Sequence, residues 1–200
     1  MDTNNMKELL SRSALYGFFT CCFLSSWRKG DLENIEKHSA EVPNAWSNRV
    51  KELCIFTKDI SDEKCTSLFG GIGGCHDCES SYRSLPAGGM LADISGFYNA
   101  FGYPEEELVN KPPDHICKEL GYLSFMFAKE AHALYKEDKE AAETCSQART
   151  KFIKEHLLEW SNLFAENVSE NAPDSFFSKA AALMSEAVEA ECSKESQKTI

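Results

Sequence analysis

The sequence has few residues suited to strands and no surplus of basic charge. Valine occurs only five times in 200 residues, whereas alanine, leucine, glutamate and lysine are frequent. This composition favours helix over strand. The formal net charge of −11 argues against a nucleic-acid-binding protein, whose footprint is a basic patch. The same charge suits a partner that is itself basic.

Sequence motifs that carry common enzyme chemistry are also missing. The chain has no G-x-S-x-G, no Walker loop and no H-E-x-x-H, the arrangements that place nucleophiles, phosphates or zinc. A glycine-rich run spans residues 70–74, but no strand precedes it and no Lys-Ser/Thr follows it, so it is a poor phosphate cradle. We therefore expect a protein that is not an enzyme and that needs no cofactor.

No apolar run is long enough to cross a bilayer. The run from Ala14 to Leu24 follows two basic residues, an outline that signal peptides share. However, it contains Cys21 and Cys22, and residues 25–28 form a poor cleavage site. We expect a buried first helix in a cytoplasmic protein with reduced thiols, and a cleaved signal peptide is the alternative.

Nine cysteines are an odd number, and the chain is longer than typical disulfide-stapled secreted domains. Cys75 and Cys78 form a C-x-x-C pair, which can bind zinc or an iron–sulfur cluster or act as a redox pair. Zinc normally needs four ligands, so Cys65, His76 or Cys117 would have to complete the set. We expect no metal, and a small metal or redox protein built on this pair is the alternative.

Apolar residues recur at steps of three and four along most of the chain, the spacing of helices that bury one face. No segment alternates convincingly like a strand. The pattern predicts an all-α fold, a single-domain helical bundle of about eight to ten helices over residues 1–190. Its expected parts are N-terminal helices at 1–69, a glycine-rich loop at 70–89, C-terminal helices at 90–190 and a polar tail at 191–200.

Individual helices are expected from the periodic stretches and their end signals. The expected helices with both ends defined span residues 6–30, 90–101, 114–135 and 138–164, and Gly102 is the expected stop of the second. A short helix is expected after Asp31, one helix is expected to start at Pro43 and the last at Pro173, and a helical turn is expected at 64–69. The loop at 70–89 holds six of the eleven glycines. Long ordered loops in compact domains are usually functional.

Residues 111–120, Lys-Pro-Pro-Asp-His-Ile-Cys-Lys-Glu-Leu, combine a stiff entry with a helix start. The prolines bar the residue before each from helical geometry, and Asp114 is a preferred helix N-cap. The Asp114–His115 pair is therefore expected where a buried helix exposes its first N–H groups. His115 and Glu119 are four residues apart and could pair on one face. In the alternative interpretation, Asp114 only caps the helix and His115 packs beside it.

The segment P-P-D-H-I-x-x-E-L resembles the signature of the TorD/DmsD family of redox-enzyme maturation chaperones, and three further segments agree in order. They are Leu68–Gly70 followed by Glu79–Tyr82, Phe97–Tyr98 followed by Phe101–Gly102, and Phe152 followed by His156–Leu157 and Trp160. The resemblance covers about residues 12–190, and four segments in the right order and spacing are fairly specific.

The resemblance implies a cytoplasmic chaperone that binds the twin-arginine leader and the apo form of a molybdenum-cofactor oxidoreductase, assists cofactor insertion and delays export. The implied partners are that apo-molybdoenzyme subunit and its leader peptide, without nucleic acid and without stable membrane insertion. The chain itself would be a monomer or a homodimer. A nitrate-reductase-type assembly chaperone without an exported leader is the alternative in the same class.

A leader with two arginines and an apolar stretch needs carboxylates and an aromatic groove. The candidate signal-peptide-binding residues are Phe69, Glu79, Tyr82, Tyr98, Pro113, Asp114, His115, Glu119 and Tyr122. For residues 79–82 the alternative is a loop that returns to the helical body with its tyrosine half-buried. His156 and Trp160 lie four residues apart on one helix face, and we interpret them as core packing.

Overall fold

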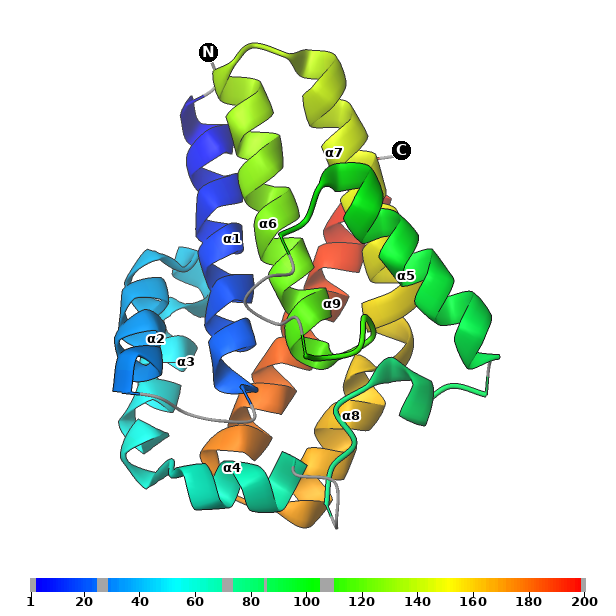
Figure 1. Cartoon of the computed structure of the whole chain (residues 1–200). Coiled ribbons are helices and arrows are strands. Elements are labelled where there is room, and N and C mark those ends of the chain that lie inside the picture. The colour runs from blue at the N-terminus through cyan, green and yellow to red at the C-terminus, as the bar shows by residue number, and fades with distance from the viewer. Residues whose placement is uncertain (1–2, 25–28, 70–73, 85, 105–109, 199–200) are drawn as a thin grey trace.

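The helices pack as a bundle around one long helix pair (Figure 1). The computed structural model describes residues 3–24, 29–69, 74–84, 86–104 and 110–198. The helices are α1 (Thr3–Cys22), α2 (Lys29–Glu41), α3 (Asn44–Ile55), α4 (Asp62–Phe69), α5 (Ala87–Phe101), α6 (Ile116–Tyr135), α7 (Lys139–Phe152), α8 (Leu158–Asn171) and α9 (Phe176–Lys198), with short turns η1 (Phe56–Asp59), η2 (Glu79–Ser81) and η4 (Ile153–Leu157). Strand pairing within these described ranges is limited to one isolated bridge, between Cys78 and His115. The prediction of an all-α, single-domain bundle is confirmed.

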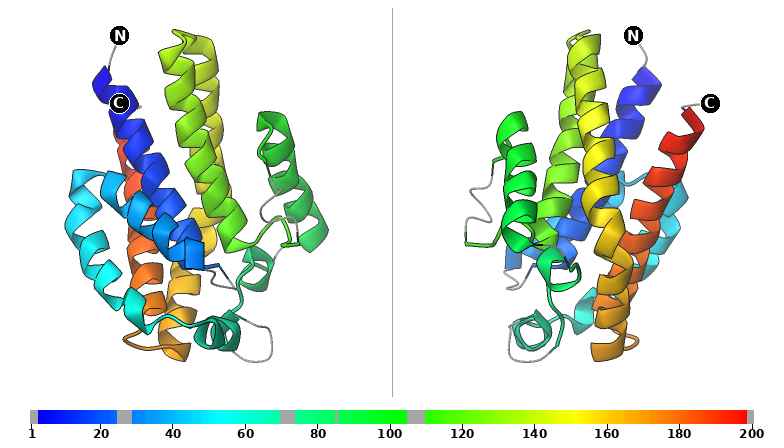
Figure 2. Two further views of the ribbon diagram at one scale, coloured as in Figure 1. Left: turned by 60° about the vertical axis from the view of Figure 1, so that its left-hand side comes forward. Right: turned by 90° about the vertical axis from the view of Figure 1, so that its right-hand side faces the viewer.

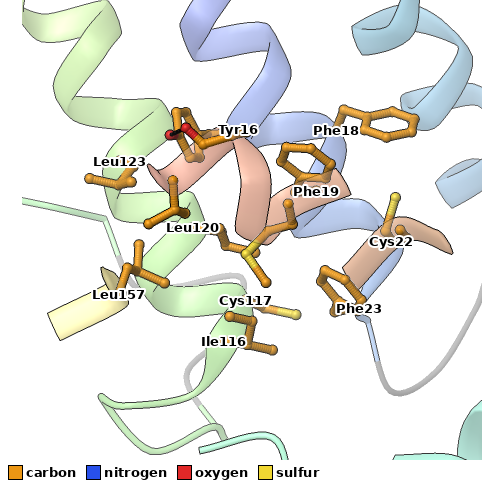
Figure 3. Close-up of a cluster of buried hydrophobic side chains, with 14 of the residues drawn as sticks. Tyr16, Phe18, Phe19, Cys22, Phe23, Ile116, Cys117, Leu120, Leu123 and Leu157 are labelled. Carbon is orange, nitrogen blue, oxygen red and sulfur yellow. Dashed lines mark hydrogen bonds between the residues drawn. The ribbon is translucent and has the colours of Figure 1, made fainter. Parts of the chain in front are cut away.

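Among the described helices, α1 and α6 pack most extensively against each other, and α5 lies at the edge (Figures 1 and 2). Tyr16 of α1 stacks on Phe127 of α6, with ring centroids 5.5 Å apart and planes 11° apart. Figure 3 shows Tyr16 in one apolar cluster with Leu120 and Leu123 of α6. These side chains are fully buried, so the helical stripe predicted from the sequence forms the core.

The last helix extends past the end that the sequence predicts. The polar composition predicts a tail from residue 191, whereas α9 continues to Lys198. Glu191 is 3% exposed, and its Oε2 accepts a hydrogen bond from Arg12 Nη1 of α1 at 3.1 Å. This buried ion pair joins the first and last helices, and a hydrophobic pattern contains no signal for it.

The helix predicted at 138–164 is divided by the π turn η4 into α7 and α8. Asp138 caps α7 as the sequence indicates, because its Oδ1 accepts a hydrogen bond from the backbone N–H of Ala141 at 2.9 Å. A π turn is wider than an α turn and is frequent at functional sites. Here it contains His156, whose contacts are described below.

Other boundaries differ in detail. The first helix ends at Cys22 rather than near residue 30, and residues 70–73 of the predicted glycine-rich loop lie outside the described ranges. Gly102 ends α5 in the left-handed conformation, with φ +65°, as expected of a C-terminal stop. Among the helices described here, none combines the length and the apolar character that a bilayer span requires.

Candidate functional site

Two motif segments far apart in the sequence lie against each other at the start of α6 (Figure 1). The backbone N–H of Glu79 donates to the carbonyl of Asp114 at 2.9 Å, and that of Ile116 donates to the carbonyl of Asp77 at 2.8 Å. We call segments 74–84 and 110–119, with the side chains that contact them, the junction. Its paired backbone fixes the positions from which the polar side chains project.

Asp114 does not cap α6, contrary to the prediction. The N-cap is His115, whose Nδ1 accepts a hydrogen bond from the backbone N–H of Cys117 at 3.1 Å. Asp114 is 1% exposed, and its Oδ2 accepts from the backbone N–H of Ser80 at 3.0 Å in the facing segment. A turn closed by the N–H of His115 on the carbonyl of Pro112 (3.2 Å) starts the helix one residue later. The aspartate is thereby free to hold the other segment.

The partner of His115 is Asp77, not Glu119 as the four-residue spacing suggests. Its Nε2 lies 2.9 Å from Asp77 Oδ2, and since Nδ1 is an acceptor, Nε2 carries the ring proton. Burial acts to raise the pKa of Asp77, but the hydrogen bond from His115 and the positive charge of Lys111 help to lower it more. The net pKa of Asp77 is therefore below its usual value.

Glu79 is fully buried and is held by two basic side chains. Arg83 Nη1 donates to Glu79 Oε1, and His156 Nδ1 lies 3.0 Å from Glu79 Oε2. The other ring nitrogen, His156 Nε2, lies 3.1 Å from Asp93 Oδ2 of α5. Through these two contacts, His156 links η4, segment 74–84 and α5.

Glu119 is the second fully buried glutamate of the junction. Its Oε2 accepts a hydrogen bond from the indole N–H of Trp160 at 3.2 Å. Burial, and next the charge of Glu79, raise the pKa of Glu119 well above its usual value, and Asp114 adds to this effect. The raised pKa favours the protonated form of Glu119, and in that form Glu119 can donate to Glu79, so that the two carboxyl groups share one proton.

Seven of the nine predicted recognition residues are buried, and Tyr82 and Pro113 are half-buried. The buried ones are Phe69, Glu79, Tyr98, Asp114, His115, Glu119 and Tyr122. The rings of Tyr98 and Tyr122 are 5.0 Å apart, and the Tyr98 hydroxyl donates to the Pro113 carbonyl at 2.9 Å. Phe69 lies apart from the carboxyl groups, in the aromatic core between α4 and α8. Of the nine, Tyr82 and Pro113 at the edge are the most accessible.

A cleft of about 380 Å³ opens where the junction meets α5. It is lined by Arg83, Pro86, Gly89, Met90, Asp93, Glu155 and His156. The side chains of Asp93 and Glu155 are 54% and 48% exposed, whereas that of Arg83 is 18% exposed. Two exposed carboxylates therefore stand near the place where the buried Glu79 network approaches solvent.

The Cys75–Cys78 pair lies at the start of segment 74–84. The Cys75 thiol donates to the carbonyl of Asn167 at 3.4 Å, and burial raises its pKa to about 11. Burial, and next the charge of Asp114, also raise the pKa of Cys78. Both thiols are protonated at neutral pH, which disfavours the thiolate chemistry of a metal or redox site. Across the part of the chain that the structure describes, no three His, Cys, Asp or Glu side chains are grouped as metal ligands.

Comparison with known proteins identifies the family. Residues 65–166, about half of the chain, match the family model described as the nitrate reductase delta subunit. A TorD chaperone of Vibrio cholerae serotype O1 (strain ATCC 39541) is 32% identical over 194 residues, and the match covers 86% of each chain. The chain belongs to the TorD-like chaperone family. The matched residues 65–166 include both junction segments, 74–84 and 110–119, of this TorD-like protein.

Two further relatives agree with this assignment. A TorD chaperone of Vibrio cholerae strain M66-2 is 26% identical over 194 residues. The perchlorate reductase assembly chaperone of Dechloromonas aromatica is 27% identical over 89 residues, which span 44% of this chain and 39% of that protein. No solved structure is significantly similar to the chain. Because its relatives are chaperones, this TorD-like protein is a chaperone and not an enzyme.

Sequence reasoning missed several members of the junction in this TorD-like protein. The prediction that His156 and Trp160 pack in the core is confirmed by their burial, but their buried N–H groups also bond Glu79 and Glu119. Buried polar atoms need partners, and that rule was the available signal. Arg83 follows Glu79 by four residues, a spacing that indicates a pair. The sequence does not show, however, that the Glu79 carboxylate in this pair is buried, because that depends on the fold.

Proposed function

We propose that this TorD-like protein binds the apo form and the twin-arginine leader of a molybdenum-cofactor oxidoreductase, assists cofactor insertion and delays export from the cytoplasm. Family membership carries the chaperone role, and the client, the leader and the location belong to the proposal. The names of the matches fit such a client, since one relative is a perchlorate reductase assembly chaperone and the family model is named for nitrate reductase.

The observation that carries the proposal is the convergence of four motif segments on the junction. Segments 79–82, 97–98, 111–120 and 152–160 are separate in the sequence, and their side chains contact one another or Glu79 at the junction. A leader arginine needs carboxylate acceptors, and charge-assisted hydrogen bonds are strong where water is excluded. The net charge of −11 adds long-range attraction for a basic peptide.

Because the carboxylates of the junction are buried, leader binding requires a movement of the protein. Glu79 and Asp114 are 0% and 1% exposed, so a leader arginine reaches them only after segment 74–84 or α5 moves. Asp93 and Glu155 at the cleft are accessible before that movement. Tyr82, half-buried against the ring of Trp160 at 5.4 Å, is an apolar surface for the stretch that follows the arginines.

A nitrate-reductase-type assembly chaperone, which binds its client without an exported leader, is the second candidate. The match of residues 65–166 to the nitrate reductase delta subunit model favours it. The match to TorD over 86% of each chain favours the first candidate. The two differ in one testable property, the need for the leader.

Calorimetric titration separates the two candidates. The ligands are the twin-arginine leader peptide of a candidate client molybdoenzyme, the same peptide with both arginines replaced by Gln, and the apoenzyme without its leader. Loss of one partner of a desolvated charged pair costs about 2–5 kcal/mol, or about 30- to 1,000-fold in affinity. We expect that loss, and a weaker salt dependence, for the Gln peptide.

Two other results of these titrations would lead to different conclusions. Binding of the leaderless apoenzyme with no binding of either peptide would support the second candidate. Failure of all three ligands to bind would reject both candidates.

A further inference from the structure

The side chain of Arg83 lines the cleft and contacts the buried Glu79. It forms an ion pair with Glu79 and donates a hydrogen bond to the carbonyl oxygen of Glu155 at 2.7 Å. The Arg83 side chain is 18% exposed and the Glu79 side chain 0%, so the arginine is the more accessible member of this pair. A carboxylate on one side and a main-chain carbonyl on the other are the acceptors that an arginine-binding site requires.

The groups around this guanidinium also suit a cation. Glu79 is the carboxylate that contacts the basic side chains of Arg83 and His156, whereas burial and the charge of Glu79 raise the pKa of its neighbour Glu119 from α6. Asp93 from α5, 54% exposed, stands in the same cleft and contacts His156. A cationic group that enters the cleft therefore meets an exposed carboxylate first and a buried carboxylate behind it.

We propose that the Glu79 carboxylate and the Glu155 carbonyl form an arginine-recognition site, which Arg83 occupies in the free protein and which an arginine of the client's leader takes over. Arg83 is then an internal competitor that sets the affinity for the leader. The identity of the incoming arginine rests on the function proposed above, whereas the site itself can be tested with a small guanidinium compound.

Exchange of one guanidinium for another avoids the cost of opening the site. If the Arg83 side chain moved away without a replacement, Glu79 would lose one of its two basic partners, Arg83 and His156. A buried charge that loses a partner is strongly unfavourable. An incoming arginine restores the same contacts while Arg83 returns to water. Both contacts come from one nitrogen, Nη1, and an ammonium group fits less well there because it is more strongly hydrated than a guanidinium and costs more to bury.

The effect of this competition on the affinity for the leader depends on the fraction of molecules in which Arg83 occupies the site. The apparent dissociation constant equals the intrinsic constant divided by the fraction of molecules with an open site. If Arg83 occupies the site in roughly nine-tenths of the molecules, its removal tightens binding by about 10-fold. A purely structural Arg83 predicts the opposite sign, because loss of its ion pair would loosen the junction and weaken binding.

Melting curves of Arg83→Ala test the site without a client. The variant lacks a guanidinium beside Glu79 and is expected to melt below wild type. N-acetylarginine amide should raise its melting temperature, and N-acetyllysine amide should not. Arg49→Ala is the matched control, since Arg49 forms an exposed ion pair with Glu186, and no arginine-specific rise is expected there. The proposed site would be rejected if the two amides changed the melting temperature of Arg83→Ala equally. It would also be rejected if N-acetylarginine amide raised the melting temperatures of Arg83→Ala and Arg49→Ala equally.

Titration of the leader peptide tests the exchange. Arg83→Ala should bind the arginine peptide about 10-fold more tightly than wild type, with Arg83→Lys in between and no gain for the Gln peptide. Arg83→Lys keeps the positive charge and serves if the alanine variant does not fold. A folded variant that binds no more tightly than a leader-binding wild type would overturn the exchange. If wild type binds no leader while N-acetylarginine amide still rescues Arg83→Ala, the leader function fails and the arginine site stands.

Discussion

The α1–α6 interface and the junction are both buried, but they are built from opposite kinds of side chain. Tyr16, Leu120 and Phe127 fill the interface with apolar surface, whose burial is favourable without specific partner atoms. Glu79 and Glu119 in the junction depend on named donors. The interface therefore supplies stability, whereas the junction is specified group by group, and loss of one partner leaves a buried polar atom unpaired.

This difference predicts separate consequences for substitutions in the two regions. Changes in the α1–α6 interface should alter stability and leave recognition by the folded molecule intact. Changes in the junction should alter recognition or the pH dependence of stability, with smaller effects on stability itself.

The largest effect is expected for Phe127→Ala. Phe127 is 0% exposed, stacks on Tyr16, and has the Arg149 guanidinium 4.2 Å from its ring centroid. Its truncation should lower the free energy of unfolding by about 3–5 kcal/mol, measured by urea denaturation. Leu163→Ala, at a residue that is 44% exposed, is the control and should change the same quantity by about 0.5 kcal/mol or less. Weaker leader binding by folded Phe127→Ala would show that the two regions are not separate.

A smaller effect on stability is expected at Asp114. Asp114→Ala removes the acceptor of the Ser80 N–H and should cost about 1–3 kcal/mol. Asp114→Asn keeps an acceptor oxygen and should cost less, about 1 kcal/mol at most. Both variants lose the charge and should bind the leader peptide more weakly by calorimetry. If Asp114→Asn binds as tightly as wild type, Asp114 is structural and takes no part in recognition.

Glu119→Gln should change the pH dependence of stability. Because the folded pKa of Glu119 is raised, its contribution to stability is present below the usual glutamate pKa and is lost as pH rises toward the raised value. Gln has no proton to lose, and it can still accept from Trp160 and donate to Glu79. Its melting temperature should therefore fall less than that of wild type between about pH 5 and pH 8.

An exposed glutamate supplies the control for this titration. Glu159→Gln, on the exposed face of α8, should keep the wild-type pH dependence. Identical pH profiles for Glu119→Gln and wild type would mean that Glu119 is ionised in the folded protein and that the shared proton is absent.

The smallest effect is expected for the double variant Cys75→Ser, Cys78→Ser. A serine hydroxyl can still donate to the Asn167 carbonyl that the Cys75 thiol contacts. We expect a change of about 1 kcal/mol or less in stability and an unchanged affinity for the leader. Stoichiometric zinc or iron in anaerobically purified wild type that disappears in the double variant would contradict this expectation and revive the metal-site alternative.

The amino-acid sequence by itself determined the helices, several of their ends and the family resemblance. The apolar period marks α6, Asp138 caps α7, and Gly102 ends α5 in the left-handed conformation. These features are local, because periodicity, capping and φ preferences depend on residues within one or two turns of each other. The four motif segments could be found in order for the same reason.

The tertiary structure alone decided how the buried polar groups pair. The Asp114 carboxylate accepts from Ser80, 34 residues earlier in the chain, rather than from its own helix, and Arg12 reaches Glu191 in the last helix. A capping rule cannot tell which backbone N–H a carboxylate will meet once another segment packs against it. Burial of seven of the nine predicted recognition residues has the same origin, since exposure is set by the packing of α5 and α8 around the junction and not by neighbouring residues.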